Sequence, residues 1–354
     1  MFFALLLLRC FAFDISARNA ILYEPETQTI LYEKNISEKR EIASTTKIMT
    51  AVVVLENTDI NDVVCVPESC VGIEGTSMYL KEDEKLTVSE LLYGMLLQSG
   101  NDAATTLAHY VGNGNITNFV QLMNSTAKRI GLQNTNFKNP SGLPDKEHYS
   151  TAYDMAKLAA YAMEIPEFRK IVSTKAKNVA GRSLSNHNKL LRIYSGANGL
   201  KTGFTKAAGR CLVSGAMRDG MQLVAVTLNA PDDWNDHKEL FDFGFSNFEI
   251  FRESKKTNED TEVAVVGGEF PNVSVNIDEE FTVLKEKNKA IERIIYAPRF
   301  LYAPIKRGEA IGRVEYLLDG EVLKSTPLIS SDDVSELRKP TFFERITVFL
   351  KNLF

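Results

Sequence analysis

The chain has 354 residues, of which 44% are hydrophobic and 25% charged, and its formal net charge is −5. This balance is ordinary for a folded globular protein, and the length allows two domains, one of them with a substantial core. The negative charge does not favour nucleic-acid binding. The four histidines and four cysteines form no metal or redox motif and no P-loop is present, so we expect no metal or nucleotide cofactor.

The first thirteen residues, 1–13, are almost wholly apolar, and only Arg9 and Cys10 interrupt the run. The run is shorter than the roughly 20 residues that a helix needs to cross a bilayer. It has the character of the hydrophobic region of an export signal, with a cleavage site at residues 10–12. We therefore expect an exported protein.

Strand and helix patterns alternate through the part of the chain that follows. Residues 19–35 predict a β-hairpin, and residues 63–85 predict short strands and turns. Thr87 and Glu90 match a capping box, which opens a helix. Apolar spacing and starting residues predict helices at 42–55, 91–97, 102–111 and 119–130, and further helices that begin at 151 and 166.

From Leu200 the apolar period changes to that of strands. Residues 200–204, 210–217 and 222–228 predict three adjacent strands, and a helix is expected over 234–245. Strands at both ends of this region with helices between them indicate one α+β domain, residues 14–252. Its sheet is expected to be completed by both ends of the region.

A polar run at residues 253–260 has the composition of a linker, and residues 261–335 follow it as a second region of strands. Within it, Asp319-Gly320 is a strong hairpin turn. The strand-like segments are 263–266, 281–284, 294–296, 310–318 and 321–329. We expect a small all-β domain that carries no catalytic constellation.

The last residues, 338–354, predict an amphipathic helix. Phenylalanine, leucine and isoleucine recur at helical spacing, and four basic residues stand against one acid. Such a helix is too short to span a bilayer and suited to lie in its interface, whereas a helix packed on the β domain would not need the cationic bias. We expect it to anchor the protein at a membrane surface.

Ser44 and Lys47 stand three residues apart at the start of the apolar helix, on one face, with Cβ atoms roughly 5–6 Å apart. A lysine in an apolar helix loses solvation, which lowers its pKa and makes it available as a base. Taken alone the pattern is weak, because Ser125 and Lys128 repeat it on an amphipathic surface helix. Two downstream motifs, Ser99-Gly100-Asn101 and Lys201-Thr202-Gly203, make it specific.

In this order the three motifs match the signature of the penicillin-recognising serine enzymes. The chain resembles the low-molecular-mass D-alanyl-D-alanine carboxypeptidases of bacterial cell walls over essentially its whole length. The resemblance implies a β-lactamase/transpeptidase-like α+β domain with an antiparallel sheet and a helical subdomain, an all-β domain and an amphipathic C-terminal helix. It further implies a peripheral enzyme at the outer face of the cytoplasmic membrane.

The resemblance implies that the enzyme removes the last D-alanine from peptidoglycan stem pentapeptides, which limits cross-linking, and that β-lactam antibiotics acylate it. Ser44 would be the nucleophile, Lys47 its base and Ser99 a proton relay, with no cofactor. Asn101 would orient Lys47 and the substrate, and the N–H groups of Ser44 and Phe204 would hold the oxyanion. Lys201 and Thr202 would bind the terminal carboxylate, and Gly203 would let the substrate backbone lie close.

Some family members carry a carboxylate-binding arginine near the helix after the last strand, but here that stretch, 231–237, has none. Arg210 is a candidate for this role. His187, just before the Lys-Thr-Gly strand, has two readings, a catalytic role and a structural, hydrogen-bonding one, of which we expect the second. A β-lactamase would share the motifs, but no Glu-x-x-Leu-Asn loop occurs between Asn101 and Lys201. A catalytically idle penicillin-binding module is the third reading, and the intact motifs argue against it.

Overall fold

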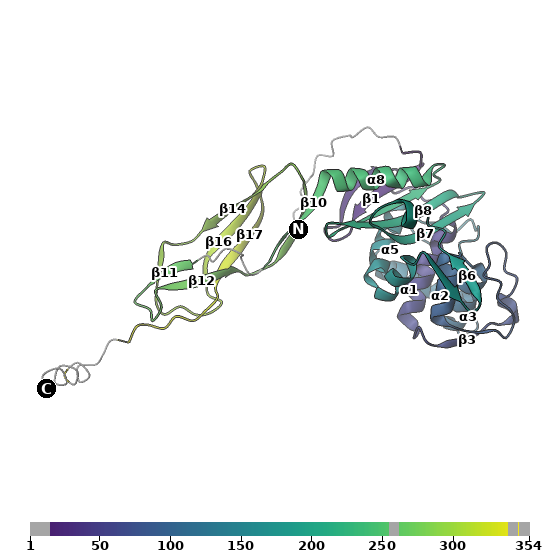
Figure 1. Ribbon diagram of the computed structural model, residues 1–354, viewed down its shortest axis with the longest axis horizontal. Coiled ribbons are helices and arrows are strands. Elements are labelled where there is room, and N and C mark those ends of the chain that lie inside the picture. Colours follow the sequence, from purple (N-terminus) through teal and green to yellow (C-terminus); the bar gives the residue numbers. More distant parts are fainter. Residues whose placement is uncertain (1–14, 255–261, 339–345, 347–354) are drawn as a thin grey trace. The chain divides into compact units, whose positions relative to one another are not determined.

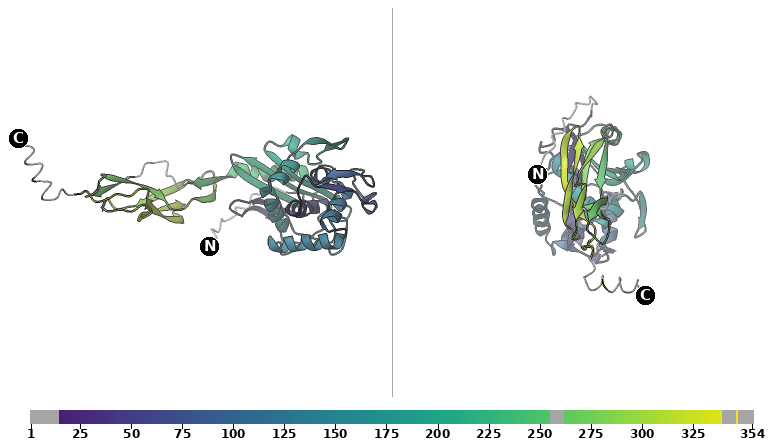
Figure 2. Two further views of the ribbon diagram at one scale, coloured as in Figure 1. Left: turned by 90° about the horizontal axis from the view of Figure 1, so that it is seen from below. Right: turned by 90° about the vertical axis from the view of Figure 1, so that its left-hand side faces the viewer.

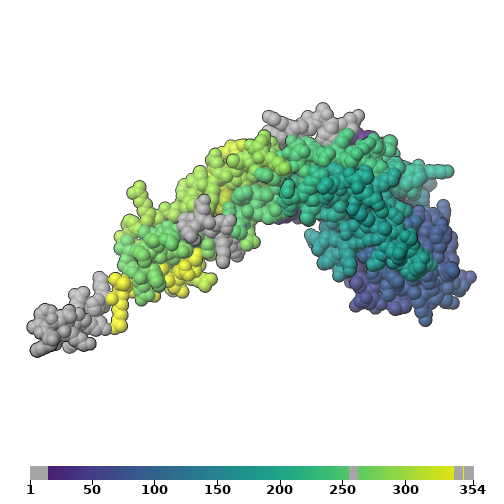
Figure 3. Space-filling model, in the orientation of Figure 1, coloured from purple at the N-terminus to yellow at the C-terminus, as the bar shows by residue number. Residues whose placement is uncertain are grey.

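A computed structural model describes residues 15–254, 262–338 and 346. The described chain divides into two compact units, which meet in the sequence between Phe248 and Glu249 (Figure 1). Figure 3 shows the surface of one face of the molecule, coloured along the sequence. The predicted export segment, linker and C-terminal helix lie outside the described residues, apart from the first two linker residues, Glu253 and Ser254, and from Arg338 and Ile346.

The first unit is built on a five-stranded antiparallel sheet with the strand order β2-β1-β9-β8-β7. Strand β1 pairs with β9, so the two ends of this region complete one sheet as the sequence predicted. The predicted hairpin is β1–β2, and the three predicted adjacent strands are β7, β8 and β9. Their bounds are β1 Asn19–Glu24, β2 Thr29–Lys34, β7 Ala197–Thr205, β8 Gly209–Arg218 and β9 Met221–Leu228.

Helices cover both faces of this sheet (Figures 1 and 2). Helix α8 packs on β8 and β9, and α5 packs on β1 and β9 beside α1. The buried side chains of α1 and α2 form one core with the inner face of the sheet. The helices are α1 Lys47–Asn57, α2 Val88–Leu97, α3 Asn101–Val111, α4 Ile116–Arg129, α5 Ala152–Glu164, α6 Pro166–Val172, α7 Leu190–Ile193 and α8 Asp233–Asn247.

Local signals in the sequence determine where several helices begin and end. The Thr87–Glu90 capping box is present at the start of α2, and Pro166 occupies the first turn of α6, as predicted. Two short antiparallel strand pairs accompany the helices. Strand β3 (Val63–Cys65) pairs with β4 (Lys85–Thr87) across the loop 66–84, and β5 (Ala176–Val179) forms a hairpin with β6 (Arg182–Ser185). The β5–β6 hairpin was not predicted, because its strands are short and mostly polar.

The second unit is all-β, as predicted. Six strands pair in the order β14-β16-β17-β12-β11-β15, and β10 pairs with β13. At the β16–β17 turn, Asp319 and Gly320 have φ of 52° and 81°, the left-handed values that a tight hairpin needs. The bounds are β10 Phe248–Glu253, β11 Glu262–Val266, β12 Asn272–Ile277, β13 Phe281–Glu286, β14 Ile291–Tyr296, β15 Phe300–Tyr302, β16 Ala310–Leu318 and β17 Glu321–Ser330.

The boundary between the two units, which falls within β10, differs from the domain boundary predicted from the sequence. Residues 249–252 were assigned to the first domain, but they cluster with the second unit, because β10 pairs with β13. Lys285 of β13 also forms an ion pair with Glu249. Strands β12 and β15 were not predicted. Among the described residues, no helix combines the length and apolar character needed to span a membrane.

Candidate active site

Ser44 lies in a single 3-10 turn, Ala43–Thr46, that leads directly into α1. Ala43 has a φ of 46°, a left-handed value that a residue with a Cβ adopts only under constraint. Three residues along, the Lys47 amine is 2.9 Å from the Ser44 hydroxyl oxygen. The structure therefore brings together the pair whose proximity the sequence predicted.

The Lys47 amine is wholly buried and has two further partners. It donates to Oδ1 of Asn101 at 2.6 Å and to the carbonyl of Ser141 at 2.8 Å. Burial lowers the pKa of Lys47 well below its ordinary value, and the charge of Lys201 lowers it further, against an opposing effect of Asp102. An amine in this environment can be neutral, which a base requires.

Ser99 and Asn101 lie where α2 ends and α3 begins, and both are buried. Ser99 has a φ of 65°, so the chain turns sharply between the two helices. The backbone N–H of Asn101 donates to the carbonyl of Thr76 at 2.7 Å, and its Nδ2 donates to the carbonyl of Glu74 at 2.5 Å. Because Nδ2 is engaged there, Oδ1 faces Lys47.

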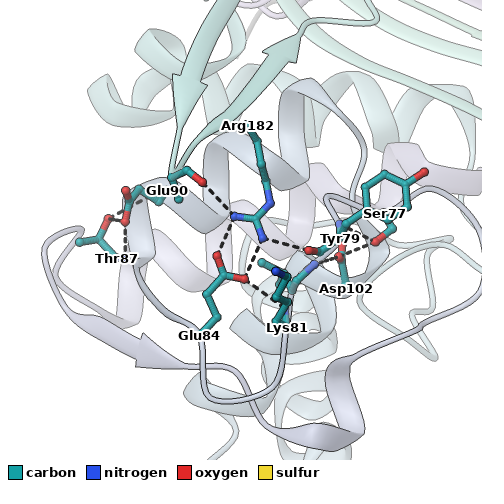
Figure 4. A network of polar contacts seen from close by, with 10 residues as sticks. Ser77, Tyr79, Lys81, Glu84, Thr87, Glu90, Asp102 and Arg182 are labelled. Atoms are coloured by element: carbon teal, nitrogen blue, oxygen red, sulfur yellow. Dashed lines mark hydrogen bonds and ion pairs between the residues drawn. The ribbon is translucent and has the colours of Figure 1, made fainter.

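The loop that supplies those carbonyls is itself held by the next residue, Asp102. Its carboxylate accepts hydrogen bonds from the backbone N–H groups of Met78 and Leu80 at 3.0 and 3.1 Å and from the hydroxyl of Ser77 at 2.6 Å. Figure 4 shows Asp102 beside Ser77 in this network. Sequence analysis gave Asp102 no role, because its partners lie more than 20 residues away.

The third motif lies on β7, an edge strand of the sheet. Lys201 is buried, its amine donates to the carbonyl of Thr202 at 2.7 Å, and burial lowers its pKa to about 7. Gly203 packs against the nucleophile's turn: an added Cβ would lie 2.9 Å from the nitrogen of Ser44. The backbone contact with Ser44 therefore requires a glycine at this position. Sequence analysis had given a different reason, close approach of the substrate backbone.

One cavity of about 350 Å³ joins the three motifs. His187, for which sequence analysis favoured a structural over a catalytic role, lines this cavity; partial desolvation there lowers its pKa, as does the charge of Lys201. Trp234 also lines it and was not predicted. The full lining is Ser44, Thr76, Ser99, His187, Lys189, Thr202, Gly203, Phe204, Arg210, Asp233 and Trp234.

Behind the nucleophile, a loop and a buried histidine support the 3-10 turn. Gly142 has a φ of 84°, and an added Cβ would lie 1.9 Å from the carbonyl oxygen of Ala43, so no other residue fits. The Nε2 atom of His148 is 2.8 Å from the hydroxyl of Thr46, and its Nδ1 accepts from the backbone N–H of Lys138. Sequence analysis identified this loop only as a turn.

Comparison with known proteins agrees with this geometry. A family model described as D-alanyl-D-alanine carboxypeptidase matches residues 9–232, and one described as the C-terminal domain of penicillin-binding protein 5 matches residues 245–336. The D-alanyl-D-alanine carboxypeptidase DacF of Bacillus subtilis is 33% identical over 93% of this chain and 88% of its own length. DacC of Escherichia coli is 33% identical over 95% and 88%.

Solved structures give the same result for the fold. The structure of penicillin binding protein 5 from Haemophilus influenzae matches with a TM-score of 0.73 and 32% identity, over 93% of this chain and all of that one. The structure of the D-alanyl-D-alanine carboxypeptidase DacD from Francisella tularensis matches with a TM-score of 0.70 and 29% identity, over 94% and 97%. The fold class that the sequence predicted is confirmed.

Proposed function

The chain belongs to the D-alanyl-D-alanine carboxypeptidase family, and from this premise we propose that it removes the terminal D-alanine of peptidoglycan stem pentapeptides through an acyl-enzyme on Ser44. One observation carries the proposal: a buried lysine amine lies 2.9 Å from a serine hydroxyl at the wall of a cavity. The consequence in the cell would be fewer pentapeptide donors for cross-linking of the wall.

The partners of Lys47 support its role as the base. A neutral amine has two N–H bonds and one lone pair, and two of its three partners here are carbonyl oxygens, on Asn101 and Ser141. Those carbonyls take both N–H bonds, which leaves the lone pair for the hydroxyl proton of Ser44. Asn101 thereby acts as a positioning residue for the base.

The proposed reaction has two stages, acylation of Ser44 and hydrolysis of the acyl-enzyme. The Ser44 oxygen attacks the carbonyl carbon between the two D-alanines as its proton passes to Lys47. The C–N bond breaks, and the departing amine takes a proton by way of Ser99, which lines the same cavity. Water later attacks the ester as Lys47 accepts its proton; the bond between the Ser44 oxygen and the acyl carbon breaks, Lys47 returns the proton to that oxygen, and the shortened peptide leaves.

The developing oxyanion needs two donors, and we assign these to the backbone N–H groups of Ser44 and Phe204. Support comes from the close contact of Gly203 with the Ser44 nitrogen and from β7 being an edge strand, along which alternate N–H groups face outward. Losing one such donor typically costs about 10²–10³ in rate.

Intact-protein mass spectrometry after penicillin treatment tests the nucleophile. We expect one adduct, located on Ser44, and release of free D-alanine from a pentapeptide that ends in D-Ala-D-Ala. Ser44→Ala and Lys47→Ala should lose both, while Ser125→Ala, in the repeat of the Ser-x-x-Lys pattern on α4, should keep both. An adduct elsewhere, or D-alanine release that survives in Ser44→Ala, would contradict the assignment.

The lifetime of the adduct separates this function from the alternatives that share the motifs. A carboxypeptidase holds the penicilloyl ester for a long time, whereas a β-lactamase hydrolyses it rapidly. A stable adduct with no D-alanine release from the pentapeptide would instead support an idle penicillin-binding module.

We also propose that the protein is exported and lies at the outer face of the cytoplasmic membrane, held by residues 338–354. The basis is the sequence pattern of that segment, in which apolar residues recur at helical spacing and four basic residues stand against one acid. Removal of residues 338–354 should release the protein from membrane pellets and leave D-alanine release unchanged. Continued pelleting of the truncated protein would contradict the anchor.

A further inference from the structure

The peptide group between Ala43 and Ser44 has two ends that face different surroundings. It is trans, so its C=O and N–H point in opposite directions within one plane, and whatever fixes the carbonyl also fixes the N–H. Among the described residues, the Ser44 N–H has no acceptor. Its nitrogen lies against Gly203 of β7, and both residues line the cavity. This N–H is therefore on the side where the proposed function places the oxyanion.

The carbonyl end of the same peptide group is buried behind the nucleophile. The hydroxyl of Thr46 donates to the Ala43 carbonyl oxygen at 2.8 Å, and both residues are buried. The loop at Gly142 packs on that oxygen so closely that an added Cβ would lie 1.9 Å from it. Ala43 itself has a left-handed φ, which a residue with a Cβ rarely adopts. Its surroundings, and not its own preference, therefore set the direction of its carbonyl.

His148 determines which way the Thr46 hydroxyl points. The backbone N–H of Lys138 donates to Nδ1 of His148 at 3.2 Å, so the neutral ring carries its proton on Nε2. Nε2 is 2.8 Å from the Thr46 hydroxyl oxygen and is therefore the donor of that pair. The hydroxyl accepts from the ring and keeps its own proton for the Ala43 carbonyl. Burial lowers the pKa of His148 to about 4, which keeps the ring in this neutral form at neutral pH.

We propose that Thr46 and His148 are positioning residues for the oxyanion site. Three hydrogen bonds run from the Lys138 N–H through His148 and Thr46 to the Ala43 carbonyl, and we call them the relay. The relay holds the peptide plane so that the Ser44 N–H points at the oxyanion, and it polarises that N–H, because hydrogen bonds in a chain strengthen one another. This inference rests on the proposed function. It adds two residues that do not line the cavity and act only through a backbone N–H.

Stopped-flow acylation by penicillin tests the relay, because it gives the acylation rate constant and the dissociation constant of the non-covalent complex separately. Thr46→Val keeps the shape of the side chain and removes the hydroxyl. We expect its acylation rate constant to fall roughly tenfold, less than the 10²–10³ that loss of a whole donor costs. The dissociation constant should not change, because the oxyanion forms only after binding. Thr46→Ser retains the hydroxyl and should restore most of the rate.

Thr45 provides a matched control one residue earlier. It is also buried, and its hydroxyl also donates to a carbonyl three residues back, that of Ile42, at 2.6 Å. That carbonyl belongs to a different peptide group, whose N–H has no part in the proposed oxyanion site. Thr45→Val should therefore leave the acylation rate constant unchanged. Equal rate constants in Thr45→Val and Thr46→Val would overturn the proposal, whether both variants are slow or both react like the wild type.

The contribution of His148 is measured by a double-mutant cycle. His148→Phe keeps a ring beside Phe137 and lacks both nitrogens, and it should slow acylation about as much as Thr46→Val. Combining the two changes should cost little more than either alone, because both break the same relay. Fully additive losses would contradict it. Rates are compared per labelled active site, so that any unfolded fraction lowers the amplitude of labelling and not the rate constant.

The stretching frequency of the penicilloyl ester carbonyl reports on the same N–H without turnover. Difference infrared spectra of the acyl-enzyme should show this band at a higher wavenumber in Thr46→Val, because the carbonyl accepts a weaker hydrogen bond, and at the wild-type position in Thr45→Val. An unshifted band in Thr46→Val would overturn the relay while the proposed function stands. A wild type that penicillin does not acylate would instead contradict the proposed function, so the two failures are distinguishable.

Discussion

The charge of Lys201 influences the protonation of Lys47 across the candidate site. Burial lowers the pKa of both amines, and the positive charge of Lys201 lowers that of Lys47 further. Lys201 is therefore part of the electrostatic environment of Lys47. A base that must be neutral benefits from a nearby positive charge, because that charge opposes its protonation.

We expect the variant Lys201→Met to shift the pH dependence of Ser44 acylation. Removing the charge raises the pKa of Lys47, so a higher pH is needed to deprotonate it. The ascending limb of the acylation rate should therefore move to higher pH, measured with penicillin and stopped-flow detection. Lys201→Arg keeps the charge and should leave the limb near its original position. A limb that stays in place in Lys201→Met would show that the two amines are not coupled.

At the scale of residues, the contacts that could be predicted from the sequence are those between near neighbours in the chain or within a recognised motif. Ser44 and Lys47 are neighbours because a helical turn makes them so, whatever the rest of the chain does. The carbonyl of Ser141, 94 residues from Lys47, gave no signal beyond a loop. The pairing of Arg210 with Asp233 depends equally on the sheet and α8 being in place.

At the scale of elements, the loop between β3 and β4 is held from two sides. Asp102 binds residues 77–80 from one side. Arg182 on β6 binds the loop from another side, through a two-pronged pair with Glu84, at 2.6 and 2.8 Å, and a bond to the carbonyl of Tyr79 (Figure 4). The same loop supplies the carbonyls of Glu74 and Thr76 that orient Asn101. The β5–β6 hairpin thus acts as a clamp on a wall of the site.

Releasing this clamp should slow acylation without touching the cavity. We expect Arg182→Gln to cause roughly a tenfold loss, less than the 10²-fold that a displacement of about 1 Å can cost. Hydrogen exchange of the amides in residues 76–84 should rise at the same time. In a double-mutant cycle, adding Glu84→Gln to Arg182→Gln should cost little more, because both changes break the same pair.

Arg129 offers the control for the clamp. It forms an equally close pair with Glu56, at 2.6 and 2.8 Å, between α4 and α1 and away from the cavity. Arg129→Gln should leave acylation and the exchange of residues 76–84 unchanged. If it slows acylation as much as Arg182→Gln does, the clamp has no special connection to the site.

Helices and strands were predicted correctly where the sequence carries a clear apolar period or a helix cap. Apolar helices with caps, and the three long central strands, follow from periodicity and from local side-chain bonds. The β5–β6 hairpin was not predicted, because four-residue polar strands have no clear apolar period. Its ion pair between Arg182 and Glu84 joins residues 98 positions apart, which no local pattern indicates. Strand β12 was missed because its alternation of valine with polar residues is short.

At the scale of the whole molecule, the two units differ in how they should respond to acid. All four histidines of the chain lie in the first unit. Two of them are buried there: burial lowers the pKa of His148 to about 4 and that of His237 to about 3. His237 lies on the buried face of α8, between the hydroxyls of Ser214 on β8 and Thr227 on β9.

Both histidines should make the first unit less stable in acid. Their folded pKa values lie below the unfolded value of about 6.5, so the unfolded chain binds more protons as the pH falls below that value. The free energy of unfolding therefore declines from about pH 6.5 toward pH 4. Between pH 7 and pH 5 each histidine should account for a loss of about 2 kcal/mol, by the linkage between pKa and stability.

Urea unfolding followed by tryptophan fluorescence measures this loss in the first unit alone, because Trp234 lies there. His148→Gln and His237→Gln should each be less stable than the wild type at pH 7 and show a flatter decline toward pH 5. The partly exposed His109 on α3 supplies the control, and His109→Gln should keep the full decline. A decline that persists in the double variant His148→Gln/His237→Gln would mean that carboxylates, not these two imidazoles, make the unit sensitive to acid.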